Sequence, residues 1–182
     1  RLSSIHGLER QTCVKELSAL LSSAAGEEEL AYTTTRLVRG LSSPRAASRQ
    51  GFALGLSTLL REGVIKDAQA VFTQLLGETK TAGVRGEEER DKLLGRVFGI
   101  LAVIRGGKYD QGLALELATA LVEVQQGKVW LKELCTSGLI TLLENNPTSS
   151  ELEAKVVGQY GDEGEELDAF AIRVALARIK NT

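Results

Sequence analysis

The residues Arg36-Leu-Val-Arg-Gly-Leu-Ser-Ser-Pro-Arg-Ala-Ala-Ser-Arg-Gln-Gly-Phe52 join two predicted helices through a short turn. Ser43 followed by Pro44 is typical of an N-cap and the first position of a helix. A helix is therefore predicted from Ser43 to about Gly63, and the apolar spacing before Ser43 predicts another. Together the two helices would form a hairpin.

The second helix of this hairpin distinguishes a bundle from a solenoid. Ala47, Gly51 and Leu54 lie on one side of it. Phe52 and Leu56 lie well round from them, so the helix is apolar on almost all sides. Such a helix must be contacted from several directions, as the inner helices of HEAT or armadillo stacks are. The pattern favours stacked hairpins.

Apolar residues recur at helical spacing through most of the chain, and no alternation typical of strands is present. Asp67 and Asp110 are placed to cap two helices, and Gly106-Gly107 is placed to end another. Nine helices are predicted, over about residues 9–23, 27–41, 43–63, 67–75, 87–105, 110–127, 131–145, 150–160 and 165–180.

These elements predict an all-α fold of stacked helical hairpins, an α-solenoid segment of the HEAT or armadillo kind. Sequence identity between the hairpins is weak, so the repeat is inferred from the helical pattern alone. The length of 182 residues suits a single repeat segment over residues 1–182. The chain opens on Arg1 and has no methionine, so we expect a segment of a longer protein.

Composition limits the possible functions. Hydrophobic residues make up 43% and charged residues 25%, which is typical of a folded domain. The net charge of −2 gives no overall basic field, so nucleic-acid binding would need a local basic patch. No apolar run is long enough to predict a membrane span. Cys13 and Cys135 are far apart and lack metal-ligand spacing, which favours two buried thiols in a reducing compartment over a disulfide.

Two glycine pairs are predicted to allow close packing between helices. Gly51 and Gly55 are four residues apart inside one predicted helix, and Gly95 and Gly99 are four apart inside another. Each glycine costs about 1 kcal/mol relative to alanine in a helix interior. Close approach of a neighbouring helix would offset that cost.

The candidate binding site is a cluster of arginines around the turn that joins the two helices of the predicted hairpin. From residue 31 to residue 66 there are six Lys or Arg residues and one acid. The clustered residues are Arg36, Arg39, Arg45 and Arg49. A short turn would gather them at one end of a hairpin, where they could bind nucleic acid or a partner, or could instead tie neighbouring hairpins together by salt bridges.

No catalytic, metal or cofactor site is predicted. Metal-dependent phosphoryl transfer needs converging carboxylates, and no Asp-x-Asp pair is present. His6 is the only histidine and is predicted to lie on the surface, whereas Trp130 is predicted to be core or half-buried. The aspartates are Asp67, Asp91, Asp110, Asp162 and Asp168.

Three segments resemble a known family in order along the chain. The first is the arginine-rich segment quoted above, and the second runs Glu89-Arg-Asp-Lys-Leu-Leu-Gly-Arg-Val-Phe-Gly-Ile-Leu-Ala-Val-Ile-Arg105. The third is Lys128-Val-Trp-Leu-Lys-Glu-Leu-Cys135. Together they resemble the N-terminal region of the DNA polymerase V or DNA polymerase phi family (Myb-binding protein 1A-like), most strongly over residues 30–143.

The resemblance implies a helical-repeat protein of the nucleus and nucleolus that acts in ribosome biogenesis and in rRNA transcription. Its implied partners are ribosome-assembly or transcription proteins, with no membrane and no small-molecule substrate. We therefore expect a non-catalytic scaffold. The alternative is direct binding of rDNA or rRNA through the arginine hairpin. A DNA-directed DNA polymerase, as the family name suggests, ranks third because the carboxylate motif is absent.

Overall fold

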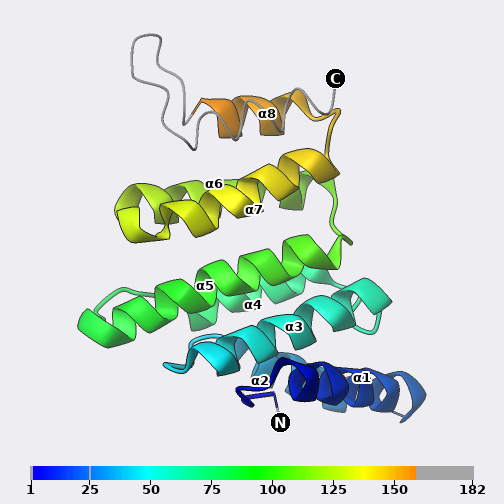
Figure 1. The fold of residues 1–182 in the computed structure, drawn as a ribbon. Helices are drawn as coiled ribbons and strands as arrows, with labels where there is room; N and C mark the ends of the chain where they lie inside the picture. Colours follow the sequence, from blue (N-terminus) through cyan, green and yellow to red (C-terminus); the bar gives the residue numbers. More distant parts are fainter. Residues whose placement is uncertain (1, 25, 159–182) are drawn as a thin grey trace. The chain divides into compact units, whose positions relative to one another are not determined.

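The computed structural model describes residues 2–24 and 26–158, and both ranges consist of α-helices joined by turns, without a β-strand (Figure 1). The all-helical prediction is confirmed there, whereas the helix predicted at 165–180 lies outside the described residues. The helices are α1 (Gly7–Ala24), α2 (Glu27–Gly40), α3 (Ala46–Glu62), α4 (Ala68–Glu78), α5 (Gly86–Gly106), α6 (Gln111–Gly127), α7 (Lys132–Asn145) and α8 (Ser150–Val157), with a 3₁₀ turn, η1 (Val129–Leu131), before α7.

Several predicted helix ends are confirmed by their hydrogen bonds. The Asp67 carboxylate accepts a bond from the backbone N–H of Ala70 at 2.8 Å, and Asp110 accepts one from Leu113 at 2.8 Å. Each aspartate satisfies a backbone donor that the first turn of its helix leaves free. Gly107 ends α5 in the left-handed conformation, with φ of 69°.

The predicted start of α3 is wrong. The helix begins at Ala46 rather than at Ser43 and Pro44. The backbone N–H of Ser43 donates to the carbonyl of Gly40 at 3.1 Å, so the turn that follows α2 extends to Ser43. The Ser43 hydroxyl accepts a bond from the N–H of Arg45 at 3.3 Å, which is a turn contact. Ser–Pro fits this turn as well as a helix start, because proline fixes only its own φ.

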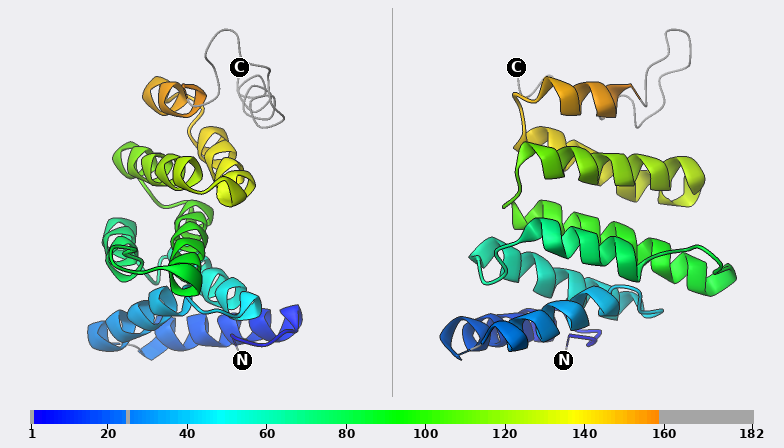
Figure 2. Two further views of the ribbon diagram at one scale, coloured as in Figure 1. Left: turned by 90° about the vertical axis from the view of Figure 1, so that its left-hand side faces the viewer. Right: turned by 180° about the vertical axis from the view of Figure 1, so that it is seen from behind.

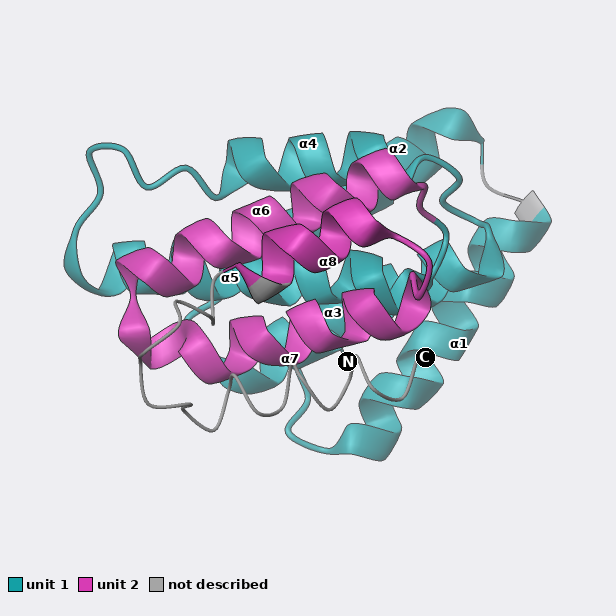
Figure 3. Cartoon of the chain, turned by 90° about the horizontal axis from the view of Figure 1, so that it is seen from above, with its two compact units in different colours: residues 1–108 teal, residues 109–182 magenta. Residues whose placement is uncertain are grey.

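The chain divides into two compact units, residues 1–108 and residues 109–182 (Figure 3). Unit 1 contains α1 to α5, and the described part of unit 2 contains α6 to α8. A single repeat segment over residues 1–182 stays a prediction.

Two side-chain contacts join α1 to α3 in unit 1. Arg10 Nη2 donates to Gln50 Oε1 at 3.2 Å, and the Ser18 hydroxyl donates to the Glu62 carboxylate. The contacts follow the same order along both helices, so α1 and α3 run parallel. The partners are 40 and 44 residues apart in sequence.

The same relation holds between α3 and α5. Arg49 Nη1 lies 3.5 Å from Asp91 Oδ1 near the start of both helices, at a separation of 42 residues. Near the end of both helices Leu60 lies against Gly106, where an added Cβ would be 2.7 Å from Leu60 Cβ. The two helices therefore also run parallel. As predicted, α3 is contacted on several sides, by α1, α2 and α5.

A second parallel pair is formed by α2 and α4. Gln74 Nε2 donates to Thr35 Oγ1 at 2.8 Å, and one turn further along both helices Arg39 Nε donates to Glu78 Oε1 at 2.9 Å. Both pairs are 39 residues apart. Unit 1 thus has two layers, with α1, α3 and α5 in one and α2 and α4 in the other. Figure 2 shows the α4–α5 hairpin nearly end-on, with its two helices side by side.

Close packing against a neighbouring helix is confirmed at two of the four predicted glycines and wrong at the other two, which face non-helical backbone. A Cβ added to Gly99 would lie 2.5 Å from the Leu75 side chain of α4, and one on Gly55 would lie 3.2 Å from Leu37 of α2. Gly95 faces the turn after α2, and Gly51 faces the carbonyl of Leu2, before α1. The pattern thus indicated a close approach at all four positions, but the neighbouring helix that it predicted is present only at Gly55 and Gly99.

The described part of unit 2 is a hairpin of α6 and α7 with α8 packed against it. Asn145 Nδ2 donates to Tyr109 Oη at 2.9 Å, which places the end of α7 beside the start of α6. Gln111 of α6 donates to Ser149, the N-cap of α8, at a separation of 38 residues. The α6–α8 pair therefore shows nearly the same sequence separation as the α2–α4 pair.

The two cysteines are free thiols in different units. Cys135 is fully buried in α7, and burial raises the pKa of its thiol to about 12. Cys13 is half-buried on α1, so only one of the two thiols is fully buried as predicted. Trp130 lies in the 3₁₀ turn and is 51% exposed, so of the two predicted alternatives the core position is wrong. His6 is exposed, as predicted.

Candidate functional site

The four predicted arginines lie on both sides of the α2–α3 turn. Arg36 and Arg39 belong to the last turns of α2, Arg45 is the N-cap residue of α3, and Arg49 lies in the first turns of α3. Because residues 41–45 join the two helices, all four backbone positions lie at one end of the hairpin. The side chains, however, have different surroundings.

Arg49 holds the hairpin together. Its residue is 9% exposed, and Nη1 donates to the backbone carbonyl of Ser43 at 2.6 Å. The same nitrogen lies 3.5 Å from the Asp91 carboxylate of α5, while Nε is buried without a hydrogen-bond partner in the described residues. A guanidinium group in this position fixes the turn and joins α3 to α5. It is not available to an external partner without local opening.

Arg39 forms a structural ion pair but stays partly accessible. Its Nε donates to Glu78 at 2.9 Å, which connects the last turns of α2 and α4. Its side chain is nevertheless 62% exposed, so water screens the pair and its contribution to stability is about 0.2–1 kcal/mol. Arg39 therefore links the two helices while much of its guanidinium group stays accessible.

Arg36 and Arg45 are exposed. Neither forms an ion pair with another residue within the part of the chain that the structure describes. The N-terminus of α3 repels the cation of Arg45, since a helix N-terminus carries partial positive charge and the first turn of α3 has no acid. The accessible charge of the cluster is thus supplied by two arginines, with a partial contribution from Arg39.

The three described aspartates are engaged in structural contacts. Asp67 and Asp110 cap helices, and Asp91 pairs with Arg49. No group of three His, Cys, Asp or Glu residues in the described ranges could hold a metal ion. Within the same ranges, no helix has the length and hydropathy of a membrane span. Asp162 and Asp168 lie outside the described residues.

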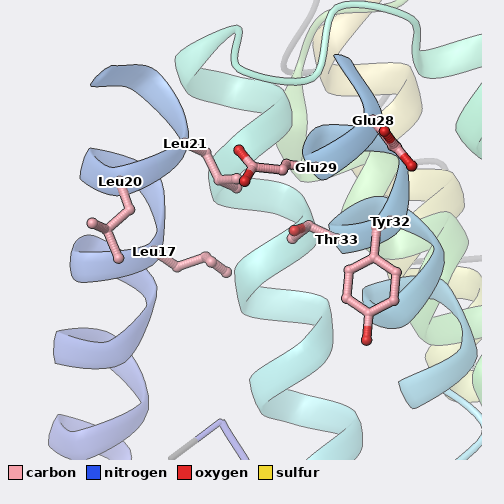
Figure 4. Close-up of a pocket in the computed structure, with 7 residues that line it drawn as sticks. All are labelled: Leu17, Leu20, Leu21, Glu28, Glu29, Tyr32 and Thr33. Atoms are coloured by element: carbon pink, nitrogen blue, oxygen red, sulfur yellow. The ribbon is translucent and has the colours of Figure 1, made fainter. Parts of the chain in front are cut away.

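An open groove between α1 and α2 was not predicted from the sequence. Its volume is about 630 Å³. Figure 4 shows Leu17 and Leu21 pointing from α1 towards α2, while Glu29 and Thr33 point back towards α1. The residues that line this α1–α2 groove are Leu17, Leu20, Leu21, Glu28, Glu29, Tyr32 and Thr33. The available signal was Leu20, an apolar residue beside the inward-facing leucines of the first helix.

A family model described as DNA polymerase phi matches residues 32–176, which include the α2–α3 turn and its four arginines. The chain belongs to the DNA polymerase phi family. The resemblance that the three sequence segments indicated is therefore confirmed.

Proteins similar to this DNA polymerase phi family chain include two yeast regulators. The rDNA transcriptional regulator pol5 of Schizosaccharomyces pombe is 30% identical over 137 residues, which cover 72% of the chain and 14% of the regulator. The rDNA transcriptional regulator POL5 of Saccharomyces cerevisiae is 24% identical over 150 residues, covering 67% of the chain and 15% of the regulator. The chain thus spans only a small part of either relative. No solved structure gives a significant match.

Proposed function

We propose that this chain is a non-catalytic helical-repeat scaffold that acts, as part of a nuclear and nucleolar protein, in rRNA gene transcription and ribosome biogenesis. Its partners on this proposal are transcription or ribosome-assembly proteins. The fold on this proposal is an α-solenoid of the HEAT or armadillo kind, and the segment 1–182 is one continuous array.

The observation that carries the proposal is the recurrence of helix contacts at a nearly constant sequence separation. Side-chain contacts between parallel helices join residues 39, 40, 42 and 44 apart in unit 1. In unit 2 a contact between α6 and the N-cap of α8 joins residues 38 apart. HEAT and armadillo repeats are about 40–47 residues long. Such arrays present extended surfaces on which partners dock, and they need no active site to do so.

The names of the similar proteins support the proposed nuclear and nucleolar location. Both similar yeast proteins are named as rDNA transcriptional regulators. Regulation of rDNA transcription takes place where ribosomal genes lie, which supports a nuclear and nucleolar location for this chain. Catalysis is disfavoured by the use of the described aspartates as two helix caps and one ion-pair partner.

Purification of the tagged protein before and after nuclease digestion tests the scaffold proposal. Transcription or ribosome-assembly proteins that stay bound after digestion would support a scaffold that works through protein contacts. Loss of all such proteins on digestion would refute it, because binding through nucleic acid would then account for the association.

Direct binding of rDNA or rRNA is the alternative, and the exposure of Arg36 and Arg45 favours it. If these side chains contact phosphates, Arg36→Glu/Arg45→Glu should weaken binding for all sequences and lower the salt slope by roughly 0.9 for each lost contact. Arg61→Glu/Arg105→Glu is the matched control, because it removes the same charge from exposed positions in the last turns of α3 and α5. Equal effects of both double variants would refute a site at the α2–α3 turn.

A further inference from the structure

The α1–α2 groove combines an exposed apolar surface with acidic residues. Leu20 is 67% exposed and Tyr32 is 66% exposed, although both are large apolar side chains. Leu17 and Leu21 are half-buried, and together with Leu20 and Tyr32 they line the groove from both helices. Exposed apolar side chains that gather around one groove are candidates for contact with a partner.

The position of the groove in the two layers indicates the shape of its occupant. α4 packs along one side of α2, and the groove lies on the α1 side of α2. A helix in the groove would pack against α2, as α4 does. It would also pack against α1, in the way that α2 packs against α3. No helix of the described residues takes this place. The arrangement of α1 and α2 therefore suits a helix as the occupant of the groove.

The charge of the groove indicates the chemistry of its occupant. Glu28 and Glu29 line it, and no basic residue does. Nucleic acid is disfavoured, because phosphates would be repelled by these carboxylates. An apolar stripe flanked by Lys or Arg would satisfy both features, since its leucines would cover Leu20 and Tyr32 while its cations met the glutamates.

We propose that the α1–α2 groove binds a basic amphipathic α-helix of a partner protein. The inference deepens the proposed scaffold function, on which it rests, by naming the class of partner. The helix would dock with apolar residues at positions i, i+3, i+4 and i+7, the spacing by which helices enter apolar grooves.

A synthetic peptide provides the probe. It is a fluorescent amphipathic helix of about 16 residues, long enough to be partly helical, with leucines on one face and lysines on both flanks. Its binding to the 182-residue chain is followed by fluorescence anisotropy. The same peptide with glutamate in place of lysine is the charge control.

Two pairs of variants separate groove binding from general effects. Leu20→Glu places a charge in the groove, while Leu8→Glu places one at an exposed α1 leucine that does not line it. Glu28→Lys reverses a groove charge, and Glu87→Lys makes the same change at the second position of α5. Glu29 is left in place because its carboxylate accepts a hydrogen bond from the backbone of Gly26.

We expect Leu20→Glu to weaken peptide binding by about tenfold or more, as loss of a central apolar contact does. We expect Glu28→Lys to weaken it by about threefold at low salt, as loss of an exposed ion pair does. Leu8→Glu and Glu87→Lys should bind as the unmodified chain does. Circular dichroism of each variant establishes that it is folded.

Three results would overturn the proposal. They are no binding at about 1 mM peptide, equal binding of the glutamate peptide, and equal weakening by the groove and control variants. Self-association of the chain that Leu20→Glu abolishes would also overturn it, because a second copy would then cover the groove. Failure of the peptide to bind, with proteins still retained after nuclease digestion, would refute the groove and leave the scaffold function standing.

Discussion

Replacement of Gly95 by alanine tests the close packing between α5 and the turn after α2. An added Cβ would lie 2.5 Å from the Ser42 hydroxyl, 3.0 Å from the Ser42 backbone nitrogen and 3.1 Å from the Leu41 carbonyl carbon. The hydroxyl can rotate away, but two of the three atoms are backbone. Arg49 also holds this turn through the carbonyl of Ser43, so the turn cannot move freely.

Two opposing effects determine how much Gly95→Ala changes the free energy of unfolding. Alanine is favoured over glycine inside a helix by about 1 kcal/mol. Overpacking against a fixed neighbour costs typically about 1–3 kcal/mol. We expect Gly95→Ala to lower the free energy of unfolding by about 1 kcal/mol, and Gly95→Leu by about 3 kcal/mol, because the larger side chain adds overpacking.

Gly77→Ala is the matched control. Gly77 lies within α4, and an added Cβ there would have no atom within 4 Å apart from the backbone of its own helix. This change should raise the free energy of unfolding by about 0.5–1 kcal/mol. Thermal unfolding followed by circular dichroism measures both variants, since 1 kcal/mol corresponds to about 2–4 °C in a chain of this size. An unchanged or raised melting temperature for Gly95→Leu would refute the packing argument.

Three further predictions concern Arg49, nucleotide incorporation and Cys135. Arg49→Ala should lower the free energy of unfolding by about 3 kcal/mol in chemical denaturation, because it leaves Asp91 unpaired; a change below about 0.5 kcal/mol would be typical of a surface site. The purified protein should incorporate no nucleotide on a primed template with magnesium, and incorporation that Asp91→Ala or Asp110→Ala abolishes would contradict this. Cys135 should react with thiol reagents far more slowly than Cys13 at pH 8, and equal reaction rates would contradict its burial. The free energy of unfolding should fall as pH rises from 9.0 to about 12, because the thiol of Cys135 ionises at lower pH in the unfolded chain than in the folded one.

The helices could largely be predicted because their signals are local. Asp67, Asp110 and Gly107 determine helix ends through hydrogen bonds or backbone conformation within a few residues. The start of α3 was wrong because Ser43 and Pro44 suit both a turn and a helix start. The turn was extended by hydrogen bonds from α2, which residue preferences alone do not reveal.

The candidate site was less predictable, because burial depends on distant residues. The sequence indicated that the four arginines gather at one end of a hairpin. It could not show that Arg49 meets Asp91, 42 residues away, or that Arg39 meets Glu78, 39 residues away. The α1–α2 groove was missed for the same reason, since the exposure of Leu20 depends on where α2 lies.

The central claim is that the protein acts through contacts with other proteins. The most direct test is the fraction of co-purifying transcription and ribosome-assembly proteins that is retained after nuclease digestion, measured for the unmodified protein and for Arg36→Glu/Arg45→Glu. The scaffold account predicts that these proteins stay bound after digestion. It also predicts that the double variant retains the same fraction of them as the unmodified protein. Release of these proteins by both treatments would contradict it and establish nucleic-acid binding at the α2–α3 turn instead.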